Sequence, residues 1–343
     1  MNPSSQGGGR LRAYLEFLAA VILFFVARAL AHGWAQGLAA PQWTPLIEQA
    51  ILVVLLLLGY AGMGLRFDHQ QRPIGAQGLP GRPGWTGEAA LGLAVGWAVA
   101  VVCVLPLVIF GGIAIVLVLQ PAAWGWLVGD AVFFALAALA EEIAFRGYGF
   151  QCFVQAVGPL GAALGYAAFY AIVQALLPGS SHSSFAVSLA LGLVLSTAYL
   201  RSGALWVSWG LNFGWKAGRA LIFGLAVSGV SNQSPVVQGN PMGPFWLTGG
   251  GYGLDASWWA FLVLLAALPV VHRLTHELNE RYNTPEIIPG GIAVDLDAAA
   301  RRQHEGAMGS AESAAPAPAV SGLVQIQPVA APAAAPADFK PEQ

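Results

Sequence analysis

Long apolar runs alternate with short polar segments along the first 272 residues of the chain. A bilayer core is crossed by about 20 consecutive apolar residues, so runs of this length are candidate membrane-spanning helices. They occupy residues 14–35, 46–65, 89–119, 126–152, 156–177, 184–200, 204–226 and 256–272. The pattern predicts an all-α fold, a polytopic membrane bundle of about eight transmembrane helices.

Two of these runs allow a second interpretation. The run at 89–119 is longer than one span needs, and Pro106 with the Gly111-Gly112 pair favours one kinked or tilted helix over a hairpin. The first run follows basic residues and could be a signal peptide. It continues past an ordinary signal-peptide core and more spans follow, which favours a membrane helix.

Lysine and arginine are distributed unevenly between the predicted loops. Eleven of them fall in the termini and loops of one side, whereas segments 36–45, 120–125, 178–183 and 227–255 on the other side contain none. Basic residues concentrate in the cytoplasmic loops of membrane proteins. We therefore expect a multi-pass protein of the cell membrane, with both termini in the cytoplasm.

The composition excludes several other classes of protein. Hydrophobic residues make up 57% of the chain and charged residues 9%, whereas a soluble domain carries about 25% charge. The formal net charge of -2, with no block of like charges, argues against a nucleic-acid partner. Neither the cysteines nor the histidines have a metal-ligand spacing, so we expect no metal and no cofactor.

Three regions follow from the pattern. Residues 1–125 form the N-terminal transmembrane helices, residues 126–272 form the core helices that carry the polar groups described next, and residues 273–343 form a cytoplasmic tail. Alanine and proline dominate the tail from Ala311 onward, and no apolar face recurs there. We therefore expect it to be mostly disordered.

The fourth run carries charges that are expensive in a membrane, roughly 2.5–3.5 kcal/mol each. Glu142 and Arg146 are four residues apart on one helix face, within reach of an ion pair. Glu141 is rotated by about 100° from Glu142, so Arg146 cannot serve both carboxylates equally. We expect Glu142 and Arg146 to form a structural pair and Glu141 to be available as a general base; the alternative is a cluster that only pins the bundle.

The seventh run supplies the opposite charges. Asn212, Lys216 and Arg219 recur at i, i+4 and i+7, which places them on one helix face. Arg219 could instead extend to the membrane interface. If both faces look into the bundle, three acidic residues balance three basic ones, namely Asp130, Glu141 and Glu142 against Arg146, Lys216 and Arg219.

The fifth run adds neutral polar groups. Tyr170 and Gln174 are four residues apart on one face of an otherwise apolar helix. The glutamine amide can hold a bound water, or it can form an ordinary hydrogen bond between helices.

The sequence Glu141-Glu142-x-x-Phe145-Arg146-Gly147 resembles the first motif of the CAAX protease and bacteriocin-processing (CPBP, or Abi) family. The stretch from Leu200 to Trp206 is similar to the family's lead into its last motif, and the likeness covers roughly residues 130–270. The resemblance implies an intramembrane glutamic endopeptidase of a prokaryotic cytoplasmic membrane. It also implies that Glu141 activates the attacking water.

The family's other two motifs are changed in this chain. Its FxxxH motif falls on Tyr170 to Gln174, and its HxxxN motif falls on Asn212 to Lys216. In the family, the first histidine assists the glutamate, and the second histidine and the asparagine stabilise the oxyanion. By the resemblance, Gln174 can hold a water but cannot take up a proton, and Asn212 can donate to the oxyanion. Lys216 either stabilises that oxyanion or pairs with Glu141 and quenches it.

Two functions remain open. The first is a CAAX-prenyl-protease-like endopeptidase that cuts a lipidated or membrane-embedded peptide. The second is a catalytically inactive relative that binds a membrane partner, as a scaffold or immunity protein. Membrane lipid surrounds the chain in either case. A transporter is disfavoured because no internal repeat is found, and a zinc protease because the motif histidines are missing. The candidate site comprises Glu141, Glu142, Arg146, Gln174, Asn212 and Lys216.

Overall fold

The fold was analysed in a computed structural model that describes residues 3–118, 120–121, 123–230, 234 and 236–283. The chain divides into two units, Met1–Thr284 and Pro285–Gln343. The second unit lies outside the described residues, as does residue 284. The predicted tail from residue 273 therefore falls almost entirely outside the described part of the chain, and its first residues continue in helix.

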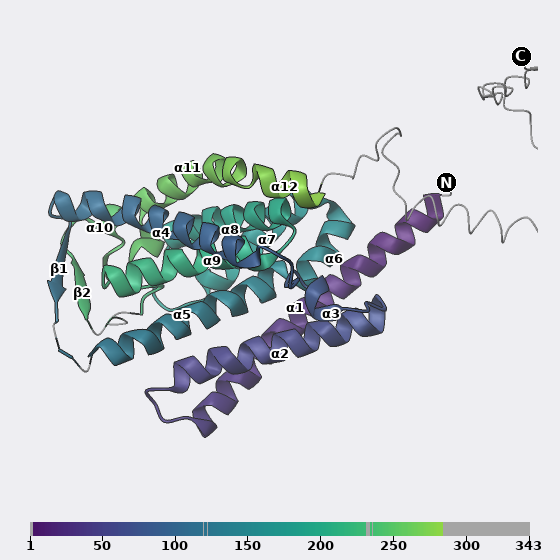
Figure 1. Ribbon diagram of the computed structural model, residues 1–343, viewed down its shortest axis with the longest axis horizontal. Helices are drawn as coiled ribbons and strands as arrows, with labels where there is room; N and C mark the ends of the chain where they lie inside the picture. The colour runs from purple at the N-terminus through teal and green to yellow at the C-terminus, as the bar shows by residue number, and fades with distance from the viewer. Residues whose placement is uncertain (1–2, 119, 122, 231–233, 235, 284–343) are drawn as a thin grey trace, which may run out of the picture. The chain divides into compact units, whose positions relative to one another are not determined.

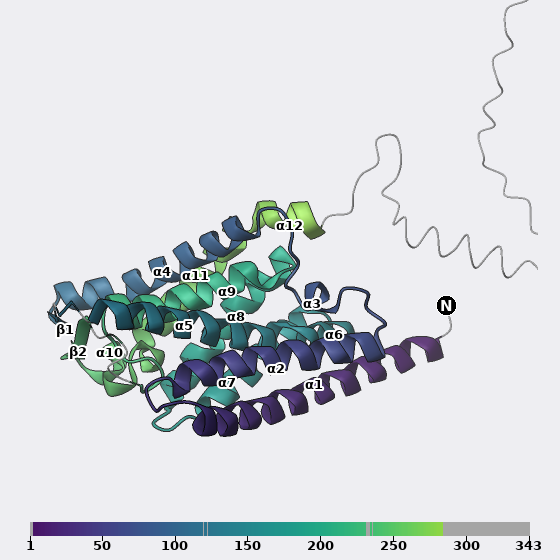
Figure 2. The same ribbon diagram turned by 60° about the horizontal axis from the view of Figure 1, so that its bottom comes forward.

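The first unit is a bundle of helices whose axes run along its length (Figures 1 and 2). Its α-helices are α1 (Pro3–Leu38), α2 (Thr44–Phe67), α3 (Pro73–Ala76), α4 (Trp85–Ile109), α5 (Ala123–Arg146), α6 (Tyr148–Val157), α7 (Pro159–Ala175), α8 (His182–Ser202), α9 (Leu205–Ala217), α10 (Phe245–Thr248), α11 (Trp258–Leu274) and α12 (His276–Asn283). Single π and 3-10 turns complete it: η1 (Gly218–Ile222), η2 (Gly250–Tyr252) and η3 (Leu254–Ala256).

Among the described residues, five helical segments are long and apolar enough to cross a membrane. They are the part of α1 from Gly9, α2, α4, the segment Ala123–Val157 and α8, and shorter apolar helices are formed by α7 and α11. The predicted all-α membrane bundle is confirmed. The protein is a multi-pass membrane protein.

The third predicted span is shorter than the apolar run that suggested it. Helix α4 ends at Ile109, and the chain then turns through Gly111, whose φ is +76°. Strand β1 (Ile113–Leu117) follows and pairs antiparallel with β2 (Val237–Pro241). The expectation of one kinked helix over 89–119 was wrong. Glycine allows the left-handed conformation that ends the helix, and the β-branched residues after it suit a strand.

The fourth and seventh predicted spans also change conformation within their runs. The fourth is interrupted at Gly147, where α5 gives way to α6. A Cβ atom there would lie 2.3 Å from the Ile143 carbonyl oxygen, so only glycine fits this break. The seventh begins as α9 and passes into the π turn η1.

Helix α8 packs against α7, α9 and α11, and α9 packs against α4 and α5. The helices α6 and α12 lie at the same end of the bundle as the start of α1, and β1, β2 and α10 lie at the other end (Figures 1 and 2). One end of the bundle is therefore helical, and the other carries the two-stranded sheet.

The contact between α4 and α9 brings two backbones together. A Cβ atom at Gly92 or Gly96 of α4 would lie 2.1 Å from a carbonyl oxygen of α9. The same distance separates a Cβ atom at Gly210 of α9 from the Ala89 carbonyl oxygen. Small residues allow such close approach between membrane helices, where dispersion contacts replace the hydrophobic effect. This contact fixes the position of α9, which carries Asn212 and Lys216.

We expect Gly96→Ala to destabilise the protein by about 1–3 kcal/mol, because the new methyl group overlaps the Leu211 carbonyl oxygen and separates the two helices. Gly87→Ala, in the same helix, has nothing within 4 Å of the new methyl group and is the matched control. The midpoint of thermal unfolding in detergent should fall for Gly96→Ala and hold for Gly87→Ala. Equal midpoints for the two variants would contradict the close contact.

Candidate active site

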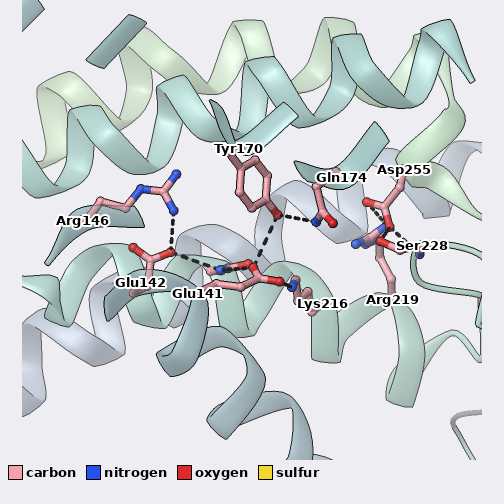
Figure 3. A network of polar contacts seen from close by, with 10 residues as sticks. Glu141, Glu142, Arg146, Tyr170, Gln174, Lys216, Arg219, Ser228 and Asp255 are labelled. Atoms are coloured by element: carbon pink, nitrogen blue, oxygen red, sulfur yellow. Dashed lines mark hydrogen bonds and ion pairs between the residues drawn. The ribbon is translucent and has the colours of Figure 1, made fainter. Parts of the chain in front are cut away.

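The Glu142 and Arg146 side chains form an ion pair that is completely buried. Arg146 Nη1 lies 3.2 Å from Glu142 Oε1, one turn away along α5, and both side chains have no exposed surface (Figure 3). A second guanidinium nitrogen donates to the Gly192 carbonyl oxygen of α8 at 3.3 Å. The guanidinium also lies 5.5 Å from the centre of the Tyr170 ring. The pair therefore connects α5 to α7 and α8 in the interior of the bundle.

Glu141, the adjacent residue, contacts a different set of groups (Figure 3). Its Oε1 accepts from the Lys216 ammonium of α9. Its Oε2 accepts from Asn212 Nδ2 at 3.0 Å and from the Tyr170 hydroxyl at 3.4 Å. Gln174 Nε2 in turn donates to the Tyr170 hydroxyl at 2.9 Å.

Asn212 connects the two carboxylates. Its amide nitrogen donates to Glu142 Oε1 at 3.1 Å as well as to Glu141 Oε2. Its side chain is fully buried. The sequence predicts that Asn212 donates to an oxyanion, but its amide nitrogen is already shared by the two glutamates. In this arrangement the residue holds the carboxylates in place.

A cavity of about 200 Å³ lies beside this network. Glu141, Tyr170, Gln174 and Lys216 line it, and the described lining does not include Glu142, Arg146 or Asn212. The Glu141 side chain is 24% exposed, whereas that of Glu142 is 0% exposed. The rotation of about 100° between consecutive helical residues thus gives the two acids different surroundings. One is enclosed by its partners and the other reaches open space.

A second buried ion pair lies next to the site, and the sequence did not predict its acidic member. Arg219 of η1 pairs with Asp255 at 2.8 Å, and its guanidinium lies 3.9 Å from the centre of the Trp215 ring. Asp255 Oδ2 also accepts from the Ser228 backbone N–H at 2.8 Å and from its hydroxyl at 3.2 Å. This pair connects the end of α9 to the segment before α11 (Figure 3).

The prediction that three acids balance three bases therefore named one wrong residue, Asp130. Asp130 lies beside a separate cavity with Trp43 and Trp126, and Arg219 pairs with Asp255, an acid that the prediction did not include. A signal for this was present, because Asp255 is the single acidic residue of segment 227–255. The alternative that Arg219 extends to the interface is also wrong, since the residue is 1% exposed.

A comparison with known protein families matches the helices that carry the candidate site. Residues 122–218 match the model of a family described as type II CAAX prenyl endopeptidase Rce1-like. The match supports the resemblance of this segment to the CAAX protease and bacteriocin-processing family. The CAAX protease match runs from α5 to α9, so it contains all six residues of the candidate site. No curated protein and no solved structure matches the chain.

The six predicted site residues lie together in the structure, in two layers. Glu142, Arg146 and Asn212 form a buried layer, and Glu141, Gln174 and Lys216 line the cavity. Among the described residues, no group of three or more His, Cys, Asp or Glu residues could hold a metal ion. At the cavity, the Glu141 carboxylate accepts from Lys216, Asn212 and Tyr170.

We expect Arg146→Met to cost about 3–5 kcal/mol of stability, because it leaves the Glu142 charge buried without its cation. Adding Glu142→Leu to Arg146→Met removes that charge and should recover part of the loss. The midpoints of thermal unfolding of the parent, the single variant and the double variant measure both effects. A double variant that is less stable than Arg146→Met alone would contradict the ion pair.

Proposed function

We propose that the chain is an intramembrane endopeptidase in which Glu141 activates a water molecule inside the cavity. The family whose model matches residues 122–218 supports the class of reaction. The position of Glu141 supports its role, because of the two adjacent acids it is the one that lines the cavity. A carboxylate can act as general base only where water can reach it.

In the proposed reaction, the water oxygen attacks the carbonyl carbon of the scissile peptide bond, and the water's proton passes to Glu141. Negative charge develops on the carbonyl oxygen of the substrate. When the carbon–nitrogen bond breaks, Glu141 returns the proton to the leaving amine. One water is consumed, and the products are a carboxylic acid and an amine.

Lys216 and Gln174 are the proposed donors to the oxyanion. Both line the cavity, and each has N–H groups beyond those that contact Glu141 and Tyr170. A fixed donor at a developing oxyanion contributes about 10²–10³-fold in rate. Asn212, Glu142 and Arg146 are positioning residues, since they hold Glu141 and the helices around it and do not line the cavity. Tyr170 lines the cavity and also positions Glu141, because its hydroxyl donates to the carboxylate.

The proposed reaction is slow, because the site has no imidazole to share the proton transfer. Gln174 stands in the second motif and cannot take up a proton, and loss of one general acid or base removes about 10²–10⁴-fold of rate. Glu141 must also break its contact with Lys216 when it becomes protonated.

A second candidate function rests on that same contact. The two oxygens of Glu141 already accept from Lys216, Asn212 and Tyr170, which is a saturated carboxylate rather than a free base. An ion pair of this kind could serve only to close the bundle. The chain would then be a catalytically inactive relative that binds a membrane partner through the cavity.

We propose further that the chain lies in the cell membrane with both termini in the cytoplasm, because its basic loops all fall on one side. The substrate of the endopeptidase is a lipidated or membrane-embedded peptide. Residues 1–125 frame the cavity from one side, residues 126–272 supply the reacting groups, and residues 273–343 form the cytoplasmic tail.

We expect Glu141→Gln to lower cleavage at least about 100-fold, because an amide cannot accept the proton. Glu142→Gln is the matched control, and its main effect should be a lower midpoint of unfolding. The measurement is mass spectrometry of a peptide library, with a prenylated peptide included, after incubation with the purified protein in detergent. Equal cleavage by the parent and the Glu141→Gln variant would reject Glu141 as the base.

The family pattern can be restored by combining Gln174→His, Asn212→His and Lys216→Asn. If the parent is a slow endopeptidase, the triple variant should cleave the same peptides about 10²–10⁴-fold faster, since a proton acceptor returns to the site. The same triple variant with Glu141→Gln is its control. Cleavage that appears in the triple variant and is absent from the parent would show that the parent is a catalytically inactive relative.

A further inference from the structure

A second cavity, of about 400 Å³, lies where the turn between α1 and α2 meets the first turns of α5. Trp43 lines it from the turn, and Trp126 and Asp130 line it from α5. Its described lining contains none of the groups proposed to react. Asp130 precedes Glu141 by eleven residues, which is about 16 Å along the helix. This acid therefore needs an explanation of its own.

The chain supplies no counter-charge for Asp130. Among the described residues its carboxylate has neither an ion-pair partner nor a hydrogen-bond donor. Lysine and arginine are absent from residues 29–65, 83–145 and 220–272, the stretches that provide the lining of this cavity. His32, in the first of these stretches, already contacts Glu48 at 3.0 Å. The cation that balances Asp130 must therefore belong to a bound molecule.

Two indole rings stand beside this carboxylate. Trp126 and Asp130 are four residues apart on one face of α5. The ring centres of Trp43 and Trp126 are 5.1 Å apart, with an angle of 33° between the ring planes. A Cβ atom at Gly129 would lie 3.8 Å from Trp43 Cζ3, so the Trp43 ring rests on the α5 backbone next to Asp130. Aromatic faces combined with a carboxylate are the groups that recognise organic cations.

The cavity lies at a membrane surface in either orientation of the chain. The turn that contains Trp43 joins α1 to α2, and both helices are long and apolar enough to span a membrane. Tryptophan also collects at the membrane–water interface. Asp130 lies about 6 Å further along α5 than Trp126, and its side chain is too short to extend back to the water as a lysine does. Val230, which also lines the cavity, is 55% exposed and adds apolar surface beside the rings.

From this arrangement we propose that the second cavity binds the ammonium headgroup of a membrane phospholipid. Asp130 provides the negative charge, and the faces of Trp43 and Trp126 attract the cation. The Gln42 amide, which also lines the cavity, provides an N–H donor for the lipid phosphate. A bound headgroup joins the α1–α2 turn to α5. This lipid site is independent of the proposed function.

Native mass spectrometry of the purified full chain in detergent tests the ligand class. Phosphatidylethanolamine, phosphatidylcholine and phosphatidylglycerol with identical acyl chains are titrated separately, and the last of these carries no cation. We expect the first molecule of either ammonium lipid to bind about 10-fold more tightly than phosphatidylglycerol. Equal affinities for the three lipids would overturn the proposal.

Variants of the lining test the site. Asp130→Asn removes the charge at nearly constant size, and Trp126→Leu removes one ring. Both should lower the affinity for the ammonium lipids about 10-fold and leave that for phosphatidylglycerol unchanged. Trp124→Leu is the matched control, because Trp124 is 53% exposed on the same helix and lies outside the described lining. A preference for ammonium lipids that survives in Asp130→Asn, or that Trp124→Leu abolishes equally, would overturn the proposal.

Free choline and ethanolamine distinguish a lipid from a soluble amine. We expect them to displace phosphatidylethanolamine only at concentrations far above that of the lipid, since they lack the part that lies in the bilayer. Binding of either free amine as tightly as the phospholipid would contradict a lipid as the occupant. The unfolding midpoint of each variant without added lipid verifies that it is folded. None of these measurements uses a peptide substrate, so their outcome is separate from that of the cleavage assays.

Discussion

The structure depends on one constraint, which is that a charge placed among apolar helices must find its counter-charge there. Three ion pairs satisfy this constraint in the described part of the site: Glu142 with Arg146, Glu141 with Lys216, and Arg219 with Asp255. The first lies within one helix, the second joins α5 to α9, and the third joins the end of α9 to the segment before α11. Helix α9 takes part in both kinds of contact, because its charges reach α5 while its glycines allow close approach to α4.

The same constraint gives the two adjacent glutamates different properties. Glu142 is enclosed by its partners and serves the fold, whereas Glu141 has one side against Lys216, Asn212 and Tyr170 and another against a cavity. Replacement of the family's histidines by an amide and of its asparagine by an ammonium produces a site rich in donors and poor in bases. Such a site offers many donors to a negative charge and few groups that can transfer a proton, and both proposed functions rest on that composition.

Different contacts enclose the two ends of the site. Aromatic side chains seal one end of the site, and a turn held by Asp255 frames the other. Arg219 pairs with Asp255 and so connects that turn to the end of α9, the helix that carries Lys216. Buried contacts therefore hold both this turn and the polar side chains of α9.

The sequence by itself determined the helical membrane bundle and the pairing of Glu142 with Arg146, because the first depends on apolar length and the second on residues four apart in one helix. Only the tertiary structure decided that the third run stops at Ile109, since the following residues pair with a strand more than a hundred residues later. It likewise decided that Arg219 binds Asp255 instead of the acids of the fourth run, and that Lys216 contacts Glu141 beside a cavity. The physical reason is that contacts between helices depend on how each helix is rotated and how closely it approaches its neighbour. The glycines of α4 and α9 allow these two helices to approach closely. That approach positions α9, and with it Asn212 and Lys216.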